Sequence, residues 1–380
     1  MKPSYDVAVV GAGILGLAHA WRLAQRGLRV VVLERGVRAQ GASVRNFGMI
    51  WPVGQPLGEL HAMAMRSREL WLAALRGSGV WHSACGSMHL AHHEDELEVM
   101  REFVEASRGT ARACELWSAD KAAEHCPQAR RPSLRGALWS PSELAVDPRE
   151  VIASLPGWLG RVYGVEFMFE TTVLGYASPS LVTSRGEFRA ERLVICAGAD
   201  FRELAPEAFR DAGLIACKLQ MMRSQAMGDE LRLRSHLAAG LTLGHYASFR
   251  SCPTLPTLVR RLAREHPEHV RLGIHVLVSQ NAAGELTIGD SHEYGPGIGP
   301  FDSPEIDGLI LDYLRGFLHL PGLRITERWH GVYVKHPSEA YVVRPVSTRA
   351  LAVTGVGGAG MTLSFGLAER VVASLLEEQP

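Results

Sequence analysis

The 380-residue sequence lacks the marks of several large protein classes. Lysine plus arginine and aspartate plus glutamate number 40 each, so neither net charge nor a basic run would attract nucleic acid. The six cysteines are scattered without a Cys-x-x-Cys pair, which argues against a zinc site or a disulfide framework. We therefore expect a cytoplasmic protein with reduced thiols that binds no nucleic acid.

Apolar runs of membrane length are also missing. Residues 7–20 ("VAVVGAGILGLAHA") have the composition of a secretory signal, but three glycines interrupt them and they are too short to cross a bilayer. We therefore expect no membrane partner. No metal is expected either, because His92, His93, Glu94 and Asp95 are adjacent rather than at ligand spacing. The chain length predicts about two domains.

The first 34 residues have the pattern of a β-turn-α-β unit. "YDVAVV" predicts a short buried strand, residues 14–26 have a helical period, and "RVVVL" predicts a second strand that ends at Glu34. A carboxylate at the end of a second strand, roughly 20 residues after a glycine turn, accepts hydrogen bonds from a ribose. The unit therefore predicts a dinucleotide site.

The turn between the first strand and the helix reads "GAGILG". Gly11 permits the tight turn, Gly13 lets the backbone approach a pyrophosphate, and Gly16 lets the helix pack closely on the strand. The free N–H groups of the helix start, at Ile14 and Leu15, would face the anion.

The same unit serves NAD and FAD, and the following segment, "GASVRNFGMIWP", helps to choose between them. It has neither helical nor strand period and contains Ser43, Arg45 and Asn46. A nicotinamide dehydrogenase usually continues with another crossover, whereas this segment is typical of a loop around a flat, polar-edged group. FAD is favoured, and an NAD dehydrogenase remains an alternative.

Five segments, in this order along nearly the whole chain, resemble the D-amino acid oxidase (DAO) family of FAD-dependent amine oxidoreductases. They are "GAGILGLAHAWRLAQRGLRVVVLER", "GASVRNFGMI", "RLVICAGAD", "ELTIGDSHEY" and "LAVTGVGGAGMTLSFGLAERVV". More narrowly, "GASVRNFGMIWPVGQP" resembles a bacterial branch associated with phosphonate breakdown and with aminoethylphosphonate-type amines.

The resemblance implies an α/β Rossmann-type FAD-binding domain and an α+β substrate domain built on a mostly antiparallel sheet. The FAD domain would be discontinuous, with residues 1–80, 143–214 and 330–380, and the substrate domain would hold residues 81–142 and 215–329. We expect a monomer or a homodimer.

The resemblance also implies where noncovalent FAD would bind. Arg45 and Asn46 would lie near the polar edge of the isoalloxazine ring, and Val173 would hold the adenine region through its backbone. The glycine-rich turn "VGGAGM" precedes a helix, and its N–H groups would stabilise the charge that gathers on the reduced ring. The full expected set is Gly11, Gly13, Ile14, Leu15, Gly16, Glu34, Arg35, Ser43, Arg45, Asn46, Gly48, Met49, Val173, Ala197, Gly198, Gly357, Gly358, Gly360, Met361 and Thr362.

Enzymes of this family remove a hydride from the carbon next to a neutral nitrogen, and the imine then hydrolyses. An aliphatic amine has a pKa near 10, so the site must select or create the neutral form. Two departures from the family matter. Tyr333 stands where amino-acid-oxidising relatives carry a carboxylate-binding arginine, and Thr287 stands where sarcosine-type oxidases keep a lysine that promotes reaction with oxygen.

A phosphonate dianion needs two or more charge-assisted donors. We expect Lys335 and His336 to be the main pair, with Tyr246 and Arg250 as more distant candidates. Each could instead be an ordinary core or surface residue. The expected catalytic and substrate-binding set is Arg45, Asn46, Arg223, His275, Tyr333, Lys335 and His336.

The leading hypothesis is FAD-dependent oxidation of (N-methyl-)2-aminoethylphosphonate to phosphonoacetaldehyde and an amine, with O2 as one candidate acceptor. The alternatives are a glycine- or sarcosine-like amino acid oxidase and a flavin-binding electron-transfer subunit of a larger complex.

Overall fold

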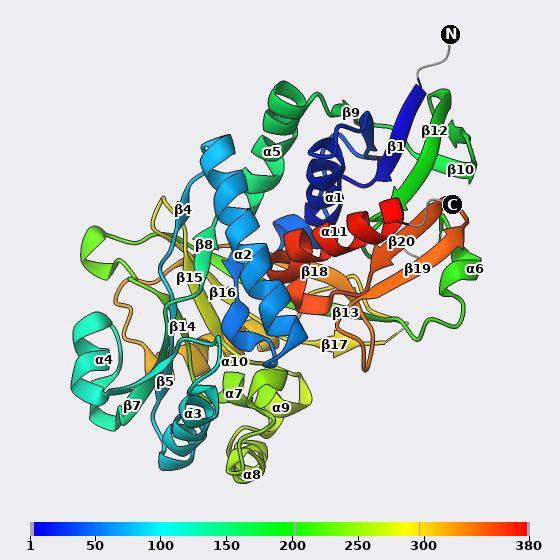
Figure 1. The fold of residues 1–380 in the computed structure, drawn as a ribbon. Helices are drawn as coiled ribbons and strands as arrows, with labels where there is room; N and C mark the ends of the chain where they lie inside the picture. Colours follow the sequence, from blue (N-terminus) through cyan, green and yellow to red (C-terminus); the bar gives the residue numbers. More distant parts are fainter. Residues whose placement is uncertain (1–3, 201–202, 296, 378–380) are drawn as a thin grey trace.

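The computed structural model describes residues 4–200, 203–295 and 297–377, which form two large sheets and one small sheet (Figure 1). The first large sheet has β1 (Ser4–Val10), β2 (Val30–Leu33), β9 (Glu166–Met168), β10 (Val173–Ala177), β11 (Ser180–Thr183), β12 (Gly186–Ile195), β19 (Val342–Ser347) and β20 (Ala350–Thr354). Its centre is parallel, with β1 between β12 and β2 and with β20 beside β12. This is the predicted Rossmann-type arrangement.

Four helices pack together beside this sheet: α1 (Ile14–Ala24), α2 (Glu59–Ser78), α5 (Pro148–Tyr163) and α11 (Gly360–Glu377). Their buried aromatic side chains meet, since Phe365 lies edge-on to both Trp21 and Trp71. By length and composition alone, the helical stretch Gly357–Leu376, which contains most of α11, could cross a membrane. However, 61% of its most apolar 18-residue segment is buried inside the protein. It packs on α1 and α2, as the core helix of a globular domain does.

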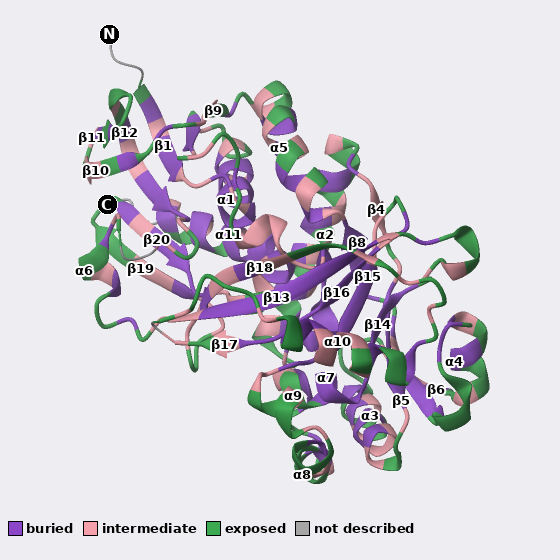
Figure 2. Cartoon of the chain, turned by 180° about the vertical axis from the view of Figure 1, so that it is seen from behind, coloured by how far each residue is buried: buried purple, intermediate pink, exposed green. Residues whose placement is uncertain are grey.

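The second large sheet lies mostly in the segments that were expected to form the substrate domain. It consists of β5 (Ser87–Ala91), β6 (Glu115–Ser118), β7 (Gly136–Ser140), β13 (Ile215–Ala226), β14 (His236–Ala238), β15 (Leu277–Gln280), β16 (Glu285–Gly289), β17 (Glu293–Tyr294) and β18 (Ile325–Lys335). Only β5 and β14 pair in parallel, so the sheet is mostly antiparallel, as predicted. Figure 2 shows β13, β15 and β16 deeply buried between the surrounding elements.

The remaining elements surround the second sheet or join the two sheets. The small sheet contains β3 (Met49–Ile50), β4 (His82–Ser83) and β8 (Leu144–Val146). The other helices are α3 (Glu94–Ser107), α4 (Ala119–His125), α6 (Pro206–Phe209), α7 (Gly240–His245), α8 (Leu255–Glu265), α9 (Pro267–Arg271) and α10 (Pro304–Phe317).

One predicted domain boundary does not coincide with the sheets. The FAD domain was expected to resume at residue 330, but this position lies within β18, which pairs with β13 from Ile325 to Lys335. A strand hydrogen-bonded along its whole length to one neighbour belongs to one sheet. By sheet membership, the return therefore falls after β18.

Candidate active site

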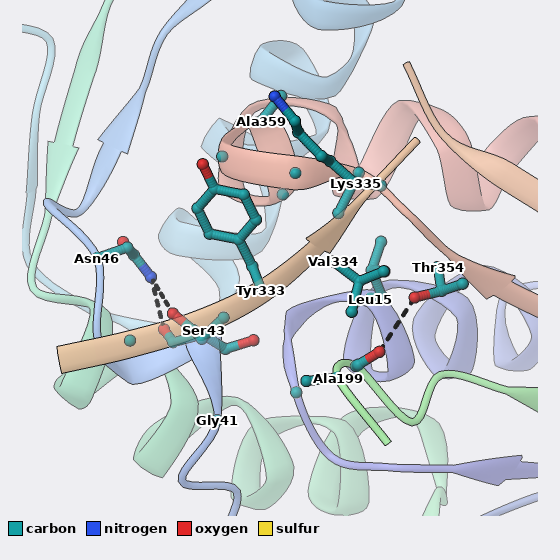
Figure 3. Close-up of a pocket in the computed structure, with 18 of the residues that line it drawn as sticks. Leu15, Gly41, Ser43, Asn46, Ala199, Tyr333, Val334, Lys335, Thr354 and Ala359 are labelled. Atoms are coloured by element: carbon teal, nitrogen blue, oxygen red, sulfur yellow. Dashed lines mark hydrogen bonds between the residues drawn. The ribbon is translucent and has the colours of Figure 1, made fainter. Parts of the chain in front are cut away.

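A cavity of about 1400 Å³ is lined by residues of both large sheets. Ligand pockets are more often about 300–1000 Å³, so this space can hold a dinucleotide together with a small substrate. Figure 3 shows part of its wall, where the loop around Ser43 faces β18 and the start of α11.

The glycine turn at one end of the cavity leaves no room for side chains. Gly11 has a φ of +95°, and a Cβ there would lie 2.5 Å from the Cys196 carbonyl oxygen. Gly13, Ile14 and Leu15 line the cavity, and Gly13, the N-cap of α1, has no side chain to occupy the N–H groups of the first turn. Ile14 N donates instead to Ser43 Oγ, and the remaining N–H groups of the turn suit an anion. Gly16 lies outside the cavity lining, against the Gly11 carbonyl.

Glu34 is held in place where β2 ends. Its Oε2 accepts a hydrogen bond from Ala12 N at 3.0 Å and its Oε1 accepts one from Gly36 N at 2.9 Å. Each carboxylate oxygen retains a lone pair on the cavity side, which suits a ribose diol. Arg35 also lines the cavity, but it pairs with Asp200 at 2.6 Å.

Further along the same end, Val173, Ala197 and Gly198 line the wall. The Gly198 carbonyl accepts a hydrogen bond from Thr354 Oγ1 at 3.1 Å, which joins this segment to β20.

The loop of residues 41–49 is shaped by Asn46. Its Nδ2 donates to the carbonyls of Ala42 and Ser43 at 3.0 and 2.9 Å (Figure 3), and its Oδ1 accepts from Gly48 N at 2.8 Å. Asn46 therefore shapes the loop, and its amide is already fully hydrogen-bonded. Gly48 does not line the cavity, because it packs against the Val146 carbonyl oxygen, 2.0 Å from where a Cβ would be.

Asn46 itself lines the cavity, and so do three of its neighbours, Ser43, Arg45 and Met49. Arg45 lines it and donates through Nη1 to the His330 carbonyl at 3.1 Å. Ser43 accepts a hydrogen bond from Ile14 N at 2.9 Å, so it ties the loop to α1, and Met49 lines the wall.

The second glycine turn lies at the start of α11. Gly357, Gly358, Gly360, Met361 and Thr362 all line the cavity. A Cβ on Gly357 would lie 3.3 Å from that of Lys335, and one on Gly358 would lie 3.9 Å from the Tyr333 hydroxyl. The turn therefore brings the N-terminus of α11 next to β18, where its dipole favours negative charge.

We call His245, His275, His292, Tyr246 and Tyr333 the ring wall. Ring centroids are 3.7 Å apart for His245 and His275, 5.7 Å for Tyr246 and His275, and 6.3 Å for His292 and Tyr333. Of its histidines, only His275 was predicted. The sequence offers no signal for the others, because His245 ends α7 and His292 follows β16 with no recurring spacing.

Asp290 lies among these rings. Its Oδ1 is 3.2 Å from His275 Nε2, and its Oδ2 is 4.0 Å from His292 Nε2. Burial raises the pKa of Asp290 well above its usual value, and burial also lowers the pKa of His245, His275 and His292, the last to about 4. Burial therefore favours the uncharged form of each of these four side chains.

Lys335 and Arg250 are cations that line the cavity. Lys335 Nζ lies 4.0 Å from the centre of the Tyr294 ring. Within the described residues, no carboxylate lies at ion-pair distance from either cation. Both charges are thus available to an anionic ligand.

His336, which was expected to act beside Lys335, also lines the cavity, but its ring nitrogens contact the loop that follows it. Successive strand residues point to opposite faces, and Figure 3 shows Tyr333 and Lys335 on one side and Val334 on the other. His336 Nδ1 accepts hydrogen bonds from the backbone N–H groups of the following loop, at 2.9 Å from Glu339 N, and its Nε2 faces the Glu339 carboxylate at 3.5 Å.

Arg223 lies outside the cavity lining, which corrects its prediction as a substrate ligand. It is buried in β13 and pairs with Glu285 at 3.4 Å and Asp147 at 3.7 Å. Thr287 lies opposite it on β16 and also outside the lining, so it is not positioned to influence oxygen there.

The glycine turn, the fixed Glu34 carboxylate and the second helix N-terminus fit an FAD molecule laid along the cavity. Together with the fold, they define a dinucleotide-dependent oxidoreductase. A family model described as FAD dependent oxidoreductase (DAO) matches residues 6–374, and the chain belongs to this family. FAD is therefore its cofactor.

Similar proteins include a glycine oxidase from Geobacillus kaustophilus, 29% identical over 211 residues that cover 52% of this chain and 56% of that protein. The gamma-glutamylputrescine oxidoreductase of Escherichia coli K12 is 25% identical, with 98% of this chain and 83% of that protein covered. For several of these relatives, the chain spans about half of their length or less.

Solved structures share the fold. Glycine oxidase from Bacillus cereus ATCC 14579 superposes with a TM-score of 0.80 at 20% identity, covering 99% of this chain and 96% of that one. L-proline dehydrogenase from P. horikoshii gives 0.79 at 19% identity, covering 100% and 95%. At this identity, the likeness concerns the fold alone.

Proposed function

We propose that this protein oxidises the C–N bond of a small amine that carries a second, anionic group. The first candidate is (N-methyl-)2-aminoethylphosphonate, which would give phosphonoacetaldehyde and an amine after the imine hydrolyses. The observation that carries the proposal is the pair of cavity-lining cations, Lys335 and Arg250, without carboxylate partners among the described residues. A dianion makes stronger charge-assisted contacts with two such groups than a single carboxylate does.

Residues around the proposed substrate have separate tasks. Lys335 binds the anionic group, and the ring wall excludes water and holds the amine by its face. The N-terminus of α11 stabilises negative charge next to Tyr333. Bound FAD supplies the hydride acceptor.

A glycine- or sarcosine-like amino acid oxidase is the second candidate, and the glycine oxidases among the similar proteins favour it. Its substrate carries one carboxylate directly beside the reacting carbon. Tyr333 has only a hydroxyl where the resemblance would place an arginine, so this carboxylate would lack that contact and would rely on the same cations, Lys335 and Arg250.

The test is an anaerobic absorbance titration of the purified flavoprotein with N-methyl-2-aminoethylphosphonate, sarcosine and glycine in parallel. We expect the aminophosphonate to bleach the flavin band at the lowest concentration. Bleaching by sarcosine or glycine alone would replace the proposal with the second candidate. A flavin that dithionite reduces but none of the three amines does would favour an electron-transfer subunit.

A further inference from the structure

The buried carboxyl of Asp290 has unfilled hydrogen-bonding capacity. It lines the cavity yet is only 4% exposed. Its Oδ1 lies 3.2 Å from His275 Nε2, but this contact lacks the alignment of a hydrogen bond. Asp290 Oδ1 therefore has no partner among the described residues, and neither does the other ring nitrogen of His275, Nδ1. Buried polar atoms are rarely left unpaired, and an unpaired one at a cavity wall points to a ligand.

A metal ion is one possible ligand of the histidines beside it, since nitrogens of His245, His275 and His292 lie within 4.8 Å of one another. The rings, however, lie roughly face to face: their planes are 30° apart for His245 and His275, 40° for His245 and His292, and 20° for His275 and His292. The lone pair of a ring nitrogen lies in the ring plane, and planes this close to parallel do not meet at a point about 2 Å from each nitrogen. The stack therefore does not suit a metal.

A cationic amine fits the same place better. Among the described residues, Asp290 is the carboxylate that contacts the histidines of the ring wall, and the faces of Tyr246, His275 and Tyr333 attract a cation. The amine substrate of the proposed function is mostly an ammonium ion at neutral pH, because its pKa is near 10. It must lose a proton before a hydride can leave the neighbouring carbon.

We propose that Asp290, held against His275, receives the substrate's ammonium group and takes its proton, so that the neutral amine faces the flavin. This inference rests on the proposed function. The N–H bond breaks, the nitrogen keeps the electron pair, and the Asp290 carboxylate takes the proton. The proton that Asp290 carried before binding goes to solvent, so charge balances.

The surrounding groups support this direction. Burial favours the protonated form of the Asp290 carboxyl and the neutral form of the histidines before the ligand arrives, and an arriving ammonium favours the carboxylate. After transfer, the carboxyl and the amine are both uncharged, which a buried site tolerates best. The titratable groups that face this pair are His245, His292, Tyr246, Tyr294, Tyr333, Cys217 and Lys335.

The test compares the pH dependence of the wild type with that of Asp290→Asn. Two quantities are measured from pH 6 to 10. The first is the second-order rate constant for anaerobic reduction of the flavin by N-methyl-2-aminoethylphosphonate, and the second is the Kd of 2-amino-2-methylpropylphosphonate. The nitrogen-bearing carbon of the second compound has no hydrogen, so it binds without reacting, and its binding is read from the shift of the flavin absorbance.

We expect the wild-type curves to level off well below pH 10, at the pKa of the Asp290–His275 pair. The curves of Asp290→Asn should rise about tenfold per pH unit up to the pKa of the amine, and should approach the wild type near pH 10. Glu143→Gln is the matched control. Glu143 is also fully buried with a raised pKa but lies outside the cavity lining, and we expect this variant to follow the wild type.

Identical profiles for the wild type and Asp290→Asn would overturn the inference while leaving the proposed function intact. If no amine bleached the wild-type flavin at any pH, both would fall. Loss of binding on chelation with EDTA, restored by zinc, would replace the inference with a metal site. If Asp290→Asn does not retain flavin, His275→Asn is measured instead, and a profile that shifts in the same direction supports the inference.

Discussion

The two ends of the cavity are built from different parts of the chain. The dinucleotide end uses backbone: the turn at Gly11 and Gly13, the start of α1, and a Glu34 carboxylate fixed by two N–H groups. The substrate end uses side chains: closely packed rings, a buried carboxyl, and cations such as Lys335 that have no carboxylate partner among the described residues.

This difference indicates which end of the cavity a single substitution can alter without disturbing the backbone. Backbone N–H groups are present whatever the side chains are, so the dinucleotide end depends on the absence of Cβ atoms. At the substrate end, one substitution can remove a charge or a ring without moving the backbone. Substitutions at the first end should abolish cofactor binding, and those at the second should alter substrate preference and pH response.

The largest effect is expected from Gly16→Ala. A Cβ on Gly16 would lie 1.9 Å from the Gly11 carbonyl oxygen, so the turn and α1 must separate. We expect purified protein without bound flavin, or a loss of stability of about 3 kcal/mol or more. Flavin absorbance per mole of protein and the Tm measure this.

Gly27→Ala is the control for this variant. Gly27 has a φ of +78°, but nothing lies within 4 Å of its Cβ position. Only the backbone cost of about 1 kcal/mol should remain. A Gly16→Ala protein that holds flavin as well as Gly27→Ala would contradict the backbone-built dinucleotide end.

At the substrate end, Lys335→Met should raise the KM for an anionic amine by about 10- to 100-fold, because a charge-assisted contact contributes about 1.5–3 kcal/mol. Flavin content should stay the same, since Lys335 meets the second glycine turn through its Cβ and through a backbone bridge to Val356, and methionine keeps both. Lys335→Arg keeps the charge and should recover most of the affinity. Equal KM values for Lys335→Met and the wild type would remove Lys335 from the substrate site.

The same difference explains what the sequence could predict. Glycine turns and the acid at the end of β2 are local patterns, so Gly11, Gly13 and Glu34 could be placed on the cavity wall before the structure was known. The helix predicted over residues 14–26 from its period is likewise observed, as α1 (Ile14–Ala24).

The ring wall depends on contacts between distant segments and could not be read locally. His245 and His292 are 47 positions apart (292 − 245) and meet only because α7 and the segment after β16 converge on one cavity. His336 lines the cavity, but the sequence could not show that its ring nitrogens contact the loop that follows it. Arg223 was misjudged because its carboxylate partners come from two other segments.

Buried neutral histidines outside the site allow a test of stability against pH. His89 is fully buried, neither ring nitrogen has a partner among the described residues, and burial lowers its pKa to about 3. In the unfolded chain the pKa is near 6.5, so the unfolded state takes up a proton first as the pH falls. Stability from this group is therefore present above pH 6.5 and is lost between pH 6.5 and 3.

Accordingly, His89→Leu should be more stable than the wild type at pH 5 by about 2 kcal/mol, measured relative to their difference at pH 7.5. Urea unfolding at the two pH values provides the measurement. Exposed His319→Asn is the control and should show the wild-type pH response. A His89→Leu curve parallel to the wild type would mean that His89 titrates normally in the folded protein.

The smallest effect is expected from Arg223→Met, which tests whether this arginine stabilises the fold rather than binding the substrate. Arg223→Met removes the partner of Asp147 and Glu285, yet both carboxylates keep a hydrogen bond from Asn281, at 3.0 and 2.9 Å. We therefore expect a stability loss of only about 1–2 kcal/mol, below the cost of a fully orphaned buried charge. The KM should not change, because Arg223 lies outside the cavity lining. A raised KM with an unchanged Tm would return Arg223 to the substrate site.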